Sequence, residues 1–132
     1  MDRTWVVTPE DLKKGDLAEV GWHPAKIIDY EETEAGDDAK SPGSTNCNFR
    51  FEILEGPSKG IQPRRLFNET AWGFAKTFFA AMQYPKDEKG NYKVSSALFR
   101  QSVGHTLQIY IKRGKSNRGN EFNDVVDFRP NE

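Results

Sequence analysis

Hydrophobic and polar residues alternate along the middle of the chain, on both sides of a predicted turn. From Asn46 to Ile53 the apolar residues fall at every second position, which is the spacing of a strand buried on one side. Residues 56–60, GPSKG, are rich in Gly and Pro and predict a turn. A second strand then runs over 61–67, so the segment predicts a hairpin. The apolar face of its first strand is Cys47, Phe49, Phe51 and Ile53.

The other face of this hairpin is polar and basic. It presents Asn48, Arg50 and Gln62, together with either Arg64 or Arg65, because neighbouring residues point to opposite faces of a regular strand. Such a face suits a nucleic-acid strand or another anionic chain. It suits plain solvation equally well, and the hairpin alone does not separate these two interpretations.

Residues 17–30 predict a long strand that is bent at Gly21 or at His23-Pro24. Strict alternation puts Lys26 and Tyr30 on one face, with Asp29 on the other. An uninterrupted central strand is not expected at Pro24, because proline lacks the N–H that a sheet ladder uses.

Two more strands are predicted near the end of the chain. Residues 105–112 alternate, with Leu107, Ile109 and Ile111 on one face and Tyr110 and Lys112 on the other. Residues 114–120 predict a basic hairpin loop, and residues 122–128 predict a last strand that Pro130 ends. In that strand Phe122, Asp124, Val126 and Phe128 alternate with Asn123, Val125 and Asp127.

Three helical segments are expected between and before these strands. Residues 69–84 have apolar residues at three- and four-residue spacing, and Thr70 is positioned to cap the helix. Thr8-Pro9 with Asp11 predicts a short capped helix that Gly15 ends and that packs nearby apolar residues on the domain. Residues 96–101 predict one short turn, with Leu98 and Phe99 inward. The apolar residues of the long helix are Trp72, Phe74, Ala75, Phe78, Phe79 and Met82; those of the short one are Trp5, Val7 and Leu12.

Composition and charge change this picture in one respect. The 132 residues predict a single domain, 1–132, in which 1–16 form an N-terminal extension. The net charge is only −1, yet residues 1–55 hold 6 Lys/Arg against 13 Asp/Glu, and residues 56–132 hold 13 against 7. No acidic residue occurs over 103–120. Because a basic stripe matters more for a polyanion than the whole-chain charge, anion binding remains open.

The sequence offers little that suggests catalysis. Its one cysteine, Cys47, lies on an apolar strand face and is interpreted as core filler, and His23 and His105 as structural or solvated. No zinc-ligand spacing, phosphate-cradling Gly motif or nucleophile elbow occurs, so we expect no enzyme, metal or cofactor. The acidic residues over 31–38 do not match a calcium-loop spacing, and residues 31–45 are interpreted as a solvated loop. Without a signal pattern or a long apolar run, we expect a cytoplasmic protein outside the membrane.

The predicted order is strand, strand, strand, helix, strand, strand. This is the order of the OB-fold, a five-stranded Greek-key barrel in a mainly β class, with its α-helix between strands three and four. Its binding face lies on strands two and three, between the loops that join strands one and two and strands four and five. Here those loops are 31–45 and 114–120.

Several segments occur in this order along the chain: GWHPAKI at 21–27, FRFEILEGPSKG at 49–60, RLFN at 65–68 and NDV at 123–125. In these segments the chain resembles the small single-stranded-DNA-binding proteins of tailed phages, a family long recorded as uncharacterised phage proteins. The resemblance covers most of the chain beyond about residue 17. Many such proteins end in an acidic tail that recruits partners, whereas this sequence ends FRPNE, so recruitment of that type is not expected.

The resemblance implies sequence-independent binding of single-stranded DNA in phage replication or recombination, in the host cytoplasm, by a monomer or homodimer with other replication proteins as candidate partners. Such binding needs a basic groove and flat side chains on which bases stack. The alternative is an OB-fold adaptor that binds a protein or a sugar in the replication or virion machinery, which the acidic segment 31–38 favours. The phosphate-contact candidates are Lys26, Arg50, Arg64, Arg65, Lys112, Arg113, Lys115 and Arg118; Asn48 is a further polar contact; the stacking candidates are Trp22, Tyr30, Phe67 and Tyr110.

Overall fold

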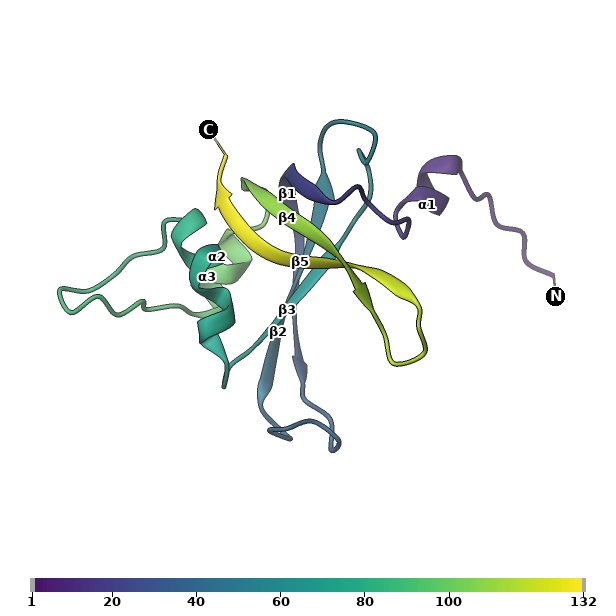
Figure 1. Ribbon diagram of the computed structural model, residues 1–132. Helices are drawn as coiled ribbons and strands as arrows, with labels where there is room; N and C mark the ends of the chain where they lie inside the picture. Colours follow the sequence, from purple (N-terminus) through teal and green to yellow (C-terminus); the bar gives the residue numbers. More distant parts are fainter. Residues whose placement is uncertain (1, 132) are drawn as a thin grey trace.

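The computed structural model describes residues 2–131 as one five-stranded antiparallel sheet with four short helical segments. The strand order is β3-β2-β1-β4-β5, so β1 lies at the centre (Figure 1). The helical segments η1, α2 and α3 fall between the third and fourth strands, as predicted. The strands are β1 Gly21–Glu34, β2 Thr45–Ile53, β3 Arg64–Asn68, β4 Thr106–Lys115 and β5 Glu121–Pro130.

The central strand β1 changes partners along its length. Residues 21–26 pair with β4, and residues 25–34 pair with β2. In the described part of the chain no backbone ladder joins the edge strands β3 and β5. Their side chains nevertheless meet, because the rings of Phe67 on β3 and Phe128 on β5 lie 6.0 Å apart. The sheet is therefore curled around its core.

The core fills the inner face of this curled sheet. Cys47, Phe49, Phe51 and Ile53 are all buried, which confirms the predicted face of β2. The predicted buried face of β4 is confirmed by the burial of Leu107, Ile109 and Ile111. Helix α2 (Lys76–Ala81) covers the core with Phe78, whose ring lies 4.8 Å from Phe49 and 5.0 Å from Phe128.

A bulge in β1 changes which residues face outward. The register with β2 shifts between Ile27 and Asp29, so Ile28 is an extra residue opposite the partner strand. Beyond the bulge, Tyr30 turns toward the core and Asp29 turns outward. The prediction that Tyr30 shares a face with Lys26 is therefore wrong, because strict alternation does not survive an inserted residue.

A second bulge has the same effect in β5. The register with β4 shifts beside Tyr110 and Ile111, where Tyr110 pairs with Asp127 and Ile111 pairs with Val125. Val125 and Phe128 are both buried, although they are three residues apart, and Val126 is 41% exposed. The predicted grouping of Val126 with Phe128 on one face is wrong for the same reason.

The first hairpin is longer than the sequence suggests. β1 continues through Pro24 without a break, contrary to the prediction, and the Pro24 carbonyl accepts a hydrogen bond from the Leu54 N–H at 2.9 Å. Its last residues also pair with β2, as far as Glu34 opposite Thr45. The predicted loop 31–45 is thus shortened to residues 35–44.

The predicted long helix is two short pieces, the 3-10 helix η1 (Trp72–Ala75) and α2. Thr70 does not cap it; the Thr70 hydroxyl bonds the Asn68 side chain instead. Phe74 is 74% exposed, so it does not widen the apolar stripe. Helix α3 (Ser96–Gln101) has the predicted bounds and buries Phe99. No helix of residues 2–131 is long and apolar enough to span a bilayer.

The N-terminal segment contains helix α1 (Pro9–Lys13), which has the predicted capping box between Thr8 and Asp11. The expected packing is wrong. Trp5, Val7 and Leu12 are 72%, 59% and 69% exposed, and α1 lies to one side of the sheet, away from α2 and α3 (Figure 1). The segment that follows α1 is attached by hydrogen bonds from Gln62 and Asn123 to the Lys14 and Asp16 carbonyls.

Candidate nucleic-acid interface

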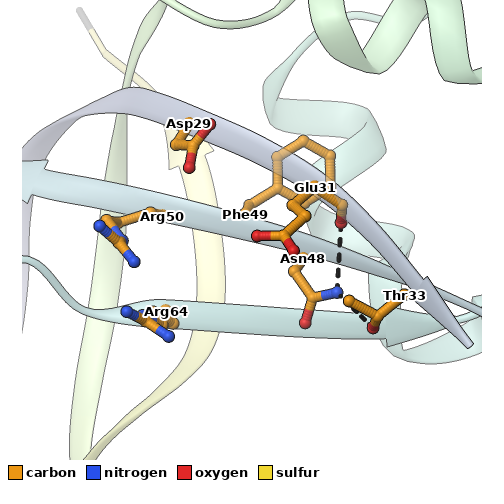
Figure 2. Close-up of a pocket in the computed structure, with 7 residues that line it drawn as sticks. All are labelled: Asp29, Glu31, Thr33, Asn48, Phe49, Arg50 and Arg64. Carbon is orange, nitrogen blue, oxygen red and sulfur yellow. Dashed lines mark hydrogen bonds between the residues drawn. The ribbon is translucent and has the colours of Figure 1, made fainter. Parts of the chain in front are cut away.

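The outer face of β1, β2 and β3, which points away from the core, contains a shallow hollow of about 200 Å³ (Figure 2). Strand β1 contributes alternate side chains to it, β2 contributes a run of three residues, and β3 contributes one. The lining residues are Asp29, Glu31, Thr33, Asn48, Phe49, Arg50 and Arg64. The structure thus brings together three of the predicted site residues, Asn48, Arg50 and Arg64.

Arg50 and Arg64 are opposite each other on β2 and β3, and their side chains point the same way in Figure 2. Arg64 is exposed, whereas Arg65 faces inward with its guanidinium 5.0 Å from the Phe67 ring. Of the two neighbouring arginines, Arg64 is therefore the one on the outer face. Asn48 is held beside them, because its amide donates to the Glu31 carbonyl at 3.2 Å and to the Thr33 hydroxyl at 3.0 Å.

Carboxylates share this face. The β1 bulge turns Asp29 and Glu31 toward Arg50 and Arg64, and on the same face Lys26 lies opposite Glu52. Among the side chains that the structure describes, none of these groups forms an ion pair within 4.0 Å. The cationic character of the face is therefore strongest at the β3 edge and weakest toward the β1–β2 loop.

A second hollow, of about 360 Å³, connects this edge to the β4–β5 hairpin. Arg64 lines both hollows, so they adjoin. The second one lies where the edge strands β3 and β5 approach each other. Its lining residues are Lys14, Gly15, Leu17, Gln62, Pro63, Arg64, Glu121, Phe122 and Asn123.

Phe122 is the flat side chain in this second hollow, and the sequence did not single it out. It is 46% exposed. It pairs with Gly114 across the strands, and its ring occupies the space that a side chain at Gly114 would need. A glycine opposite an aromatic residue in a hairpin is the sequence signal for such a ring lying over the backbone.

The tip of the β4–β5 hairpin is basic and projects from the sheet (Figure 1). Lys112, Lys115 and Arg118 are exposed, as a phosphate contact requires. Arg113 has a different role: its guanidinium donates to the Ala18 carbonyl and lies 3.8 Å from the Glu121 carboxylate. Arg113 thus links the N-terminal segment to the hairpin, and its N–H donors point toward Ala18 and Glu121.

Trp22 and Tyr110 form a separate cluster on the outer face of β1 and β4. Their ring centroids are 5.3 Å apart, edge to face. The Arg129 guanidinium covers the Trp22 ring at 4.2 Å and donates to the Gln108 side chain at 2.6 Å. Neither Trp22 nor Tyr110 lines a hollow that contains Arg64. The structure thus divides the predicted residues between two surfaces.

The other two stacking candidates belong to the core. Phe67 is 2% exposed. Tyr30 packs 4.9 Å from Phe49 and 5.5 Å from Phe99, and its hydroxyl donates to the Glu32 carboxylate at 2.6 Å. Burial raises the pKa of the Tyr30 phenol, and the hydrogen bonds to its neighbours raise it further. Neither ring offers a face to a base.

The side chains of Cys47 and His23, which could in principle take part in catalysis, are both buried. Cys47 is buried, and this burial raises the pKa of its thiol. His23 is 8% exposed, and its ring bonds the Glu19 carbonyl at 2.6 Å. Within residues 2–131 no three His, Cys, Asp or Glu side chains are grouped so as to hold a metal ion.

Comparison with known proteins adds no assignment. The chain matches no protein-family model, and a search of curated proteins finds no match.

Proposed function

We propose that this chain is a single-stranded-DNA-binding protein built on an OB-type barrel. The element order supports the barrel, as does the central strand that pairs with β4 and then with β2. Segment 14–18 also forms hydrogen bonds on both sides of the gap between the edge strands β3 and β5. The Gln62 N–H donates to the Lys14 carbonyl at 3.0 Å, and the Asn123 amide donates to the Asp16 carbonyl at 2.9 Å.

One observation supports the proposal most strongly: Arg64 lines two adjoining hollows, one on the polar β2–β3 face and one that reaches Phe122 in the β4–β5 hairpin. Cationic groups beside an exposed aromatic ring are the combination that binds single strands without reading sequence. Arg50, Arg64, Lys115 and Arg118 contact phosphates in this proposal, and Phe122 supports a base. The carboxylates of the β1–β2 hairpin repel the strand and keep it at the β3 edge.

The proposal requires no catalysis and no cofactor. Contacts are to the DNA backbone and to the flat faces of bases, so affinity depends little on sequence, and oligo-dT binds best because its bases unstack readily. A role in phage replication or recombination rests on the family resemblance.

Fluorescence titration tests this function. A labelled dT oligonucleotide of about 30 nucleotides is titrated with the parent protein and with R50A/R64A, and a duplex of the same length serves as the competitor. We expect binding by the parent, weaker binding by the variant and poor competition by duplex. Absence of binding at low salt, or tighter binding to the duplex, would contradict the proposal. The variant K89A/K93A, on the far side of the molecule near α2, is the matched charge control.

The second candidate function is a protein-binding adaptor, and one observation favours it. The N-terminal segment exposes Trp5, Val6 and Val7 by 72%, 88% and 59%, and exposed apolar groups of this kind mark protein contacts. An adaptor of this type shows no salt-dependent binding to an oligonucleotide. The same titration therefore separates the two functions.

A further inference from the structure

A third hollow lies at the end of the β2–β3 face, under the N-terminal segment. It measures about 410 Å³. Three of its six lining residues are lysines, and they come from two separate parts of the chain: helix α1 with its C-cap, and the β2–β3 loop. The lining residues are Lys13, Lys14, Glu52, Lys59, Gly60 and Gln62.

The fold fixes these lysines beside one another through backbone contacts. The Gln62 N–H donates to the Lys14 carbonyl at 3.0 Å, and the Glu19 N–H donates to the buried Ser58 hydroxyl at 2.9 Å. Gly60 adopts a φ of +90°, which lets the β2–β3 loop turn under the Lys13 side chain. The segment that leaves α1 is thus attached to the loop that holds Lys59.

The charge of the hollow is unbalanced. Among the described side chains that line the hollow, Glu52 is the only carboxylate, and it accepts a hydrogen bond from the Gln62 side chain at 3.5 Å. Lys14 pairs at 3.6 Å with Asp11, and both side chains are about half exposed, so this pair is weak. Among the described side chains, no carboxylate lies within 4.0 Å of the Lys13 or Lys59 ammonium. Among the described lining side chains, two to three positive charges therefore face one negative charge.

The position of the hollow identifies its ligand class. Lys14 and Gln62 also line the hollow that contains Arg64 and Phe122, so the two adjoin. A strand that follows Arg50 and Arg64 along β2–β3 arrives at the three lysines next. Lysine binds phosphate as a point charge, without the fixed geometry that arginine imposes, which suits a flexible backbone.

We infer that Lys13, Lys14 and Lys59 form a phosphate site that extends the DNA path beyond the β2–β3 face, so that the N-terminal segment takes part in binding. This inference rests on the proposed function for the identity of its ligand, a phosphodiester. The site itself is independent of that function and accepts inorganic polyphosphate as well.

The test compares two triple variants that remove the same charge. K13Q/K14Q/K59Q alters the site, and K76Q/K89Q/K93Q alters exposed lysines near α2 and in the loop that follows it. Binding of a dT oligonucleotide is measured over a range of salt. Each phosphate contact contributes about 0.7 to the log–log slope. We expect the first variant to lose about 0.7 to 1.4, and the control to keep the parent slope.

A second measurement separates the site from the function. The amide NMR shifts of Gly60 and Gln62 are followed as tripolyphosphate is added to the parent protein. If the parent binds DNA and K13Q/K14Q/K59Q keeps the salt slope of the parent, the phosphate site is overturned and the proposed function stands. Tripolyphosphate shifts without DNA binding support the site and overturn the function. If the parent shows neither DNA binding nor tripolyphosphate shifts, both the site and the function are overturned. A thermal melt checks that each variant is folded.

Discussion

The β1–β2 and β4–β5 hairpins both contain a β-bulge, and they differ in charge. Each contains one bulge, at Ile28 in the first and at Val126 in the second, and each bulge inverts the alternation beyond it. In the first hairpin this places Asp29 and Glu31 on the outer face. In the second the bulge is in β5, and Lys112 of the regular strand β4 lies on the outer face opposite Asp124.

The tips of these hairpins have opposite charge. They lie toward opposite ends of the central strand, because the β1–β2 tip follows Glu34 whereas the β4–β5 tip lies beyond the pairing of Ile111 with Gly21. The tip of β1–β2 is acidic and that of β4–β5 is basic, which the net charge of −1 conceals. An anionic strand is therefore attracted to one side of the molecule only. The acidic residues are Glu31, Glu32, Glu34, Asp37 and Asp38; the basic ones are Lys112, Lys115 and Arg118.

The largest expected effect concerns the core that both hairpins share. Phe51 on β2 is fully buried, and its ring lies 5.8 Å from Phe128 on β5. Phe51→Ala should lower the free energy of unfolding by about 3–5 kcal/mol, through lost burial and a residual cavity. Urea denaturation measures this effect, and the exposed Phe74→Ala is the control. Equal stability of Phe51→Ala and the parent would show that the hairpins do not pack through this ring.

Charge reversal of each hairpin tip in turn separates the contributions of the two tips to binding. K115E/R118E should weaken binding to single-stranded DNA and lower the salt slope by about 1.4, from two lost contacts of about 0.7 each. D37K/D38K changes the charge by the same amount in the opposite direction and should not weaken binding. Oligonucleotide titration at several salt concentrations measures both variants. If the second variant lost affinity as the first did, the acidic tip would be part of the binding surface.

Stacking gives a smaller effect and distinguishes the two aromatic surfaces. Phe122→Ala should cost roughly 1–3 kcal/mol of binding free energy and leave the salt slope unchanged, because stacking releases no counterion. Tyr110→Ala, on the outer face of β4, should bind nearly like the parent. The opposite ranking of these two variants would move the DNA path to the cluster of Trp22, Tyr110 and Arg129.

The smallest effect is a dependence on alkaline pH that originates in the β1–β2 hairpin. Burial raises the pKa of the Cys47 thiol above its usual 9.0 and that of the Tyr30 phenol above its usual 10.0. The folded state then retains protons that the unfolded state releases, so stability is lost as pH rises above about 9 to 10. Urea midpoints at neutral and alkaline pH measure this loss. Tyr30→Phe should show a smaller loss than the parent, and an equal loss would exclude the phenol as its source.

Much of the fold follows from local patterns. The buried faces of β2 and β4, the capping box of α1 and the bounds of α3 all depend on neighbours within a few residues, and these predictions are confirmed. The two bulges lie beyond such patterns. Neither Ile28 nor Val126 is a residue that marks a bulge, and a single insertion moved Tyr30 from the predicted surface into the core.

The candidate site was predictable only in part. Alternation restricted the outward arginine to one of two, and the structure identifies it as Arg64. The approach of Lys14 to Gln62 joins residues 48 positions apart, and the contacts of Arg113 with Ala18 join residues still more distant along the chain. Such contacts depend on the curl of the whole sheet. No local pattern contains these contacts. The sequence pattern therefore predicted Arg113 as a phosphate contact and did not indicate Lys14 or Phe122 as site residues.

We propose that single-stranded DNA binds along the β3 edge and the basic hairpin. The most direct test is the salt dependence of oligo-dT binding by the parent protein. If Arg50, Arg64, Lys115 and Arg118 each contact a phosphate, the log–log slope should be about 2 to 3, at about 0.7 per contact. The three lysines of the proposed phosphate site would raise it further. A slope near zero, or no binding at low salt, would contradict the account.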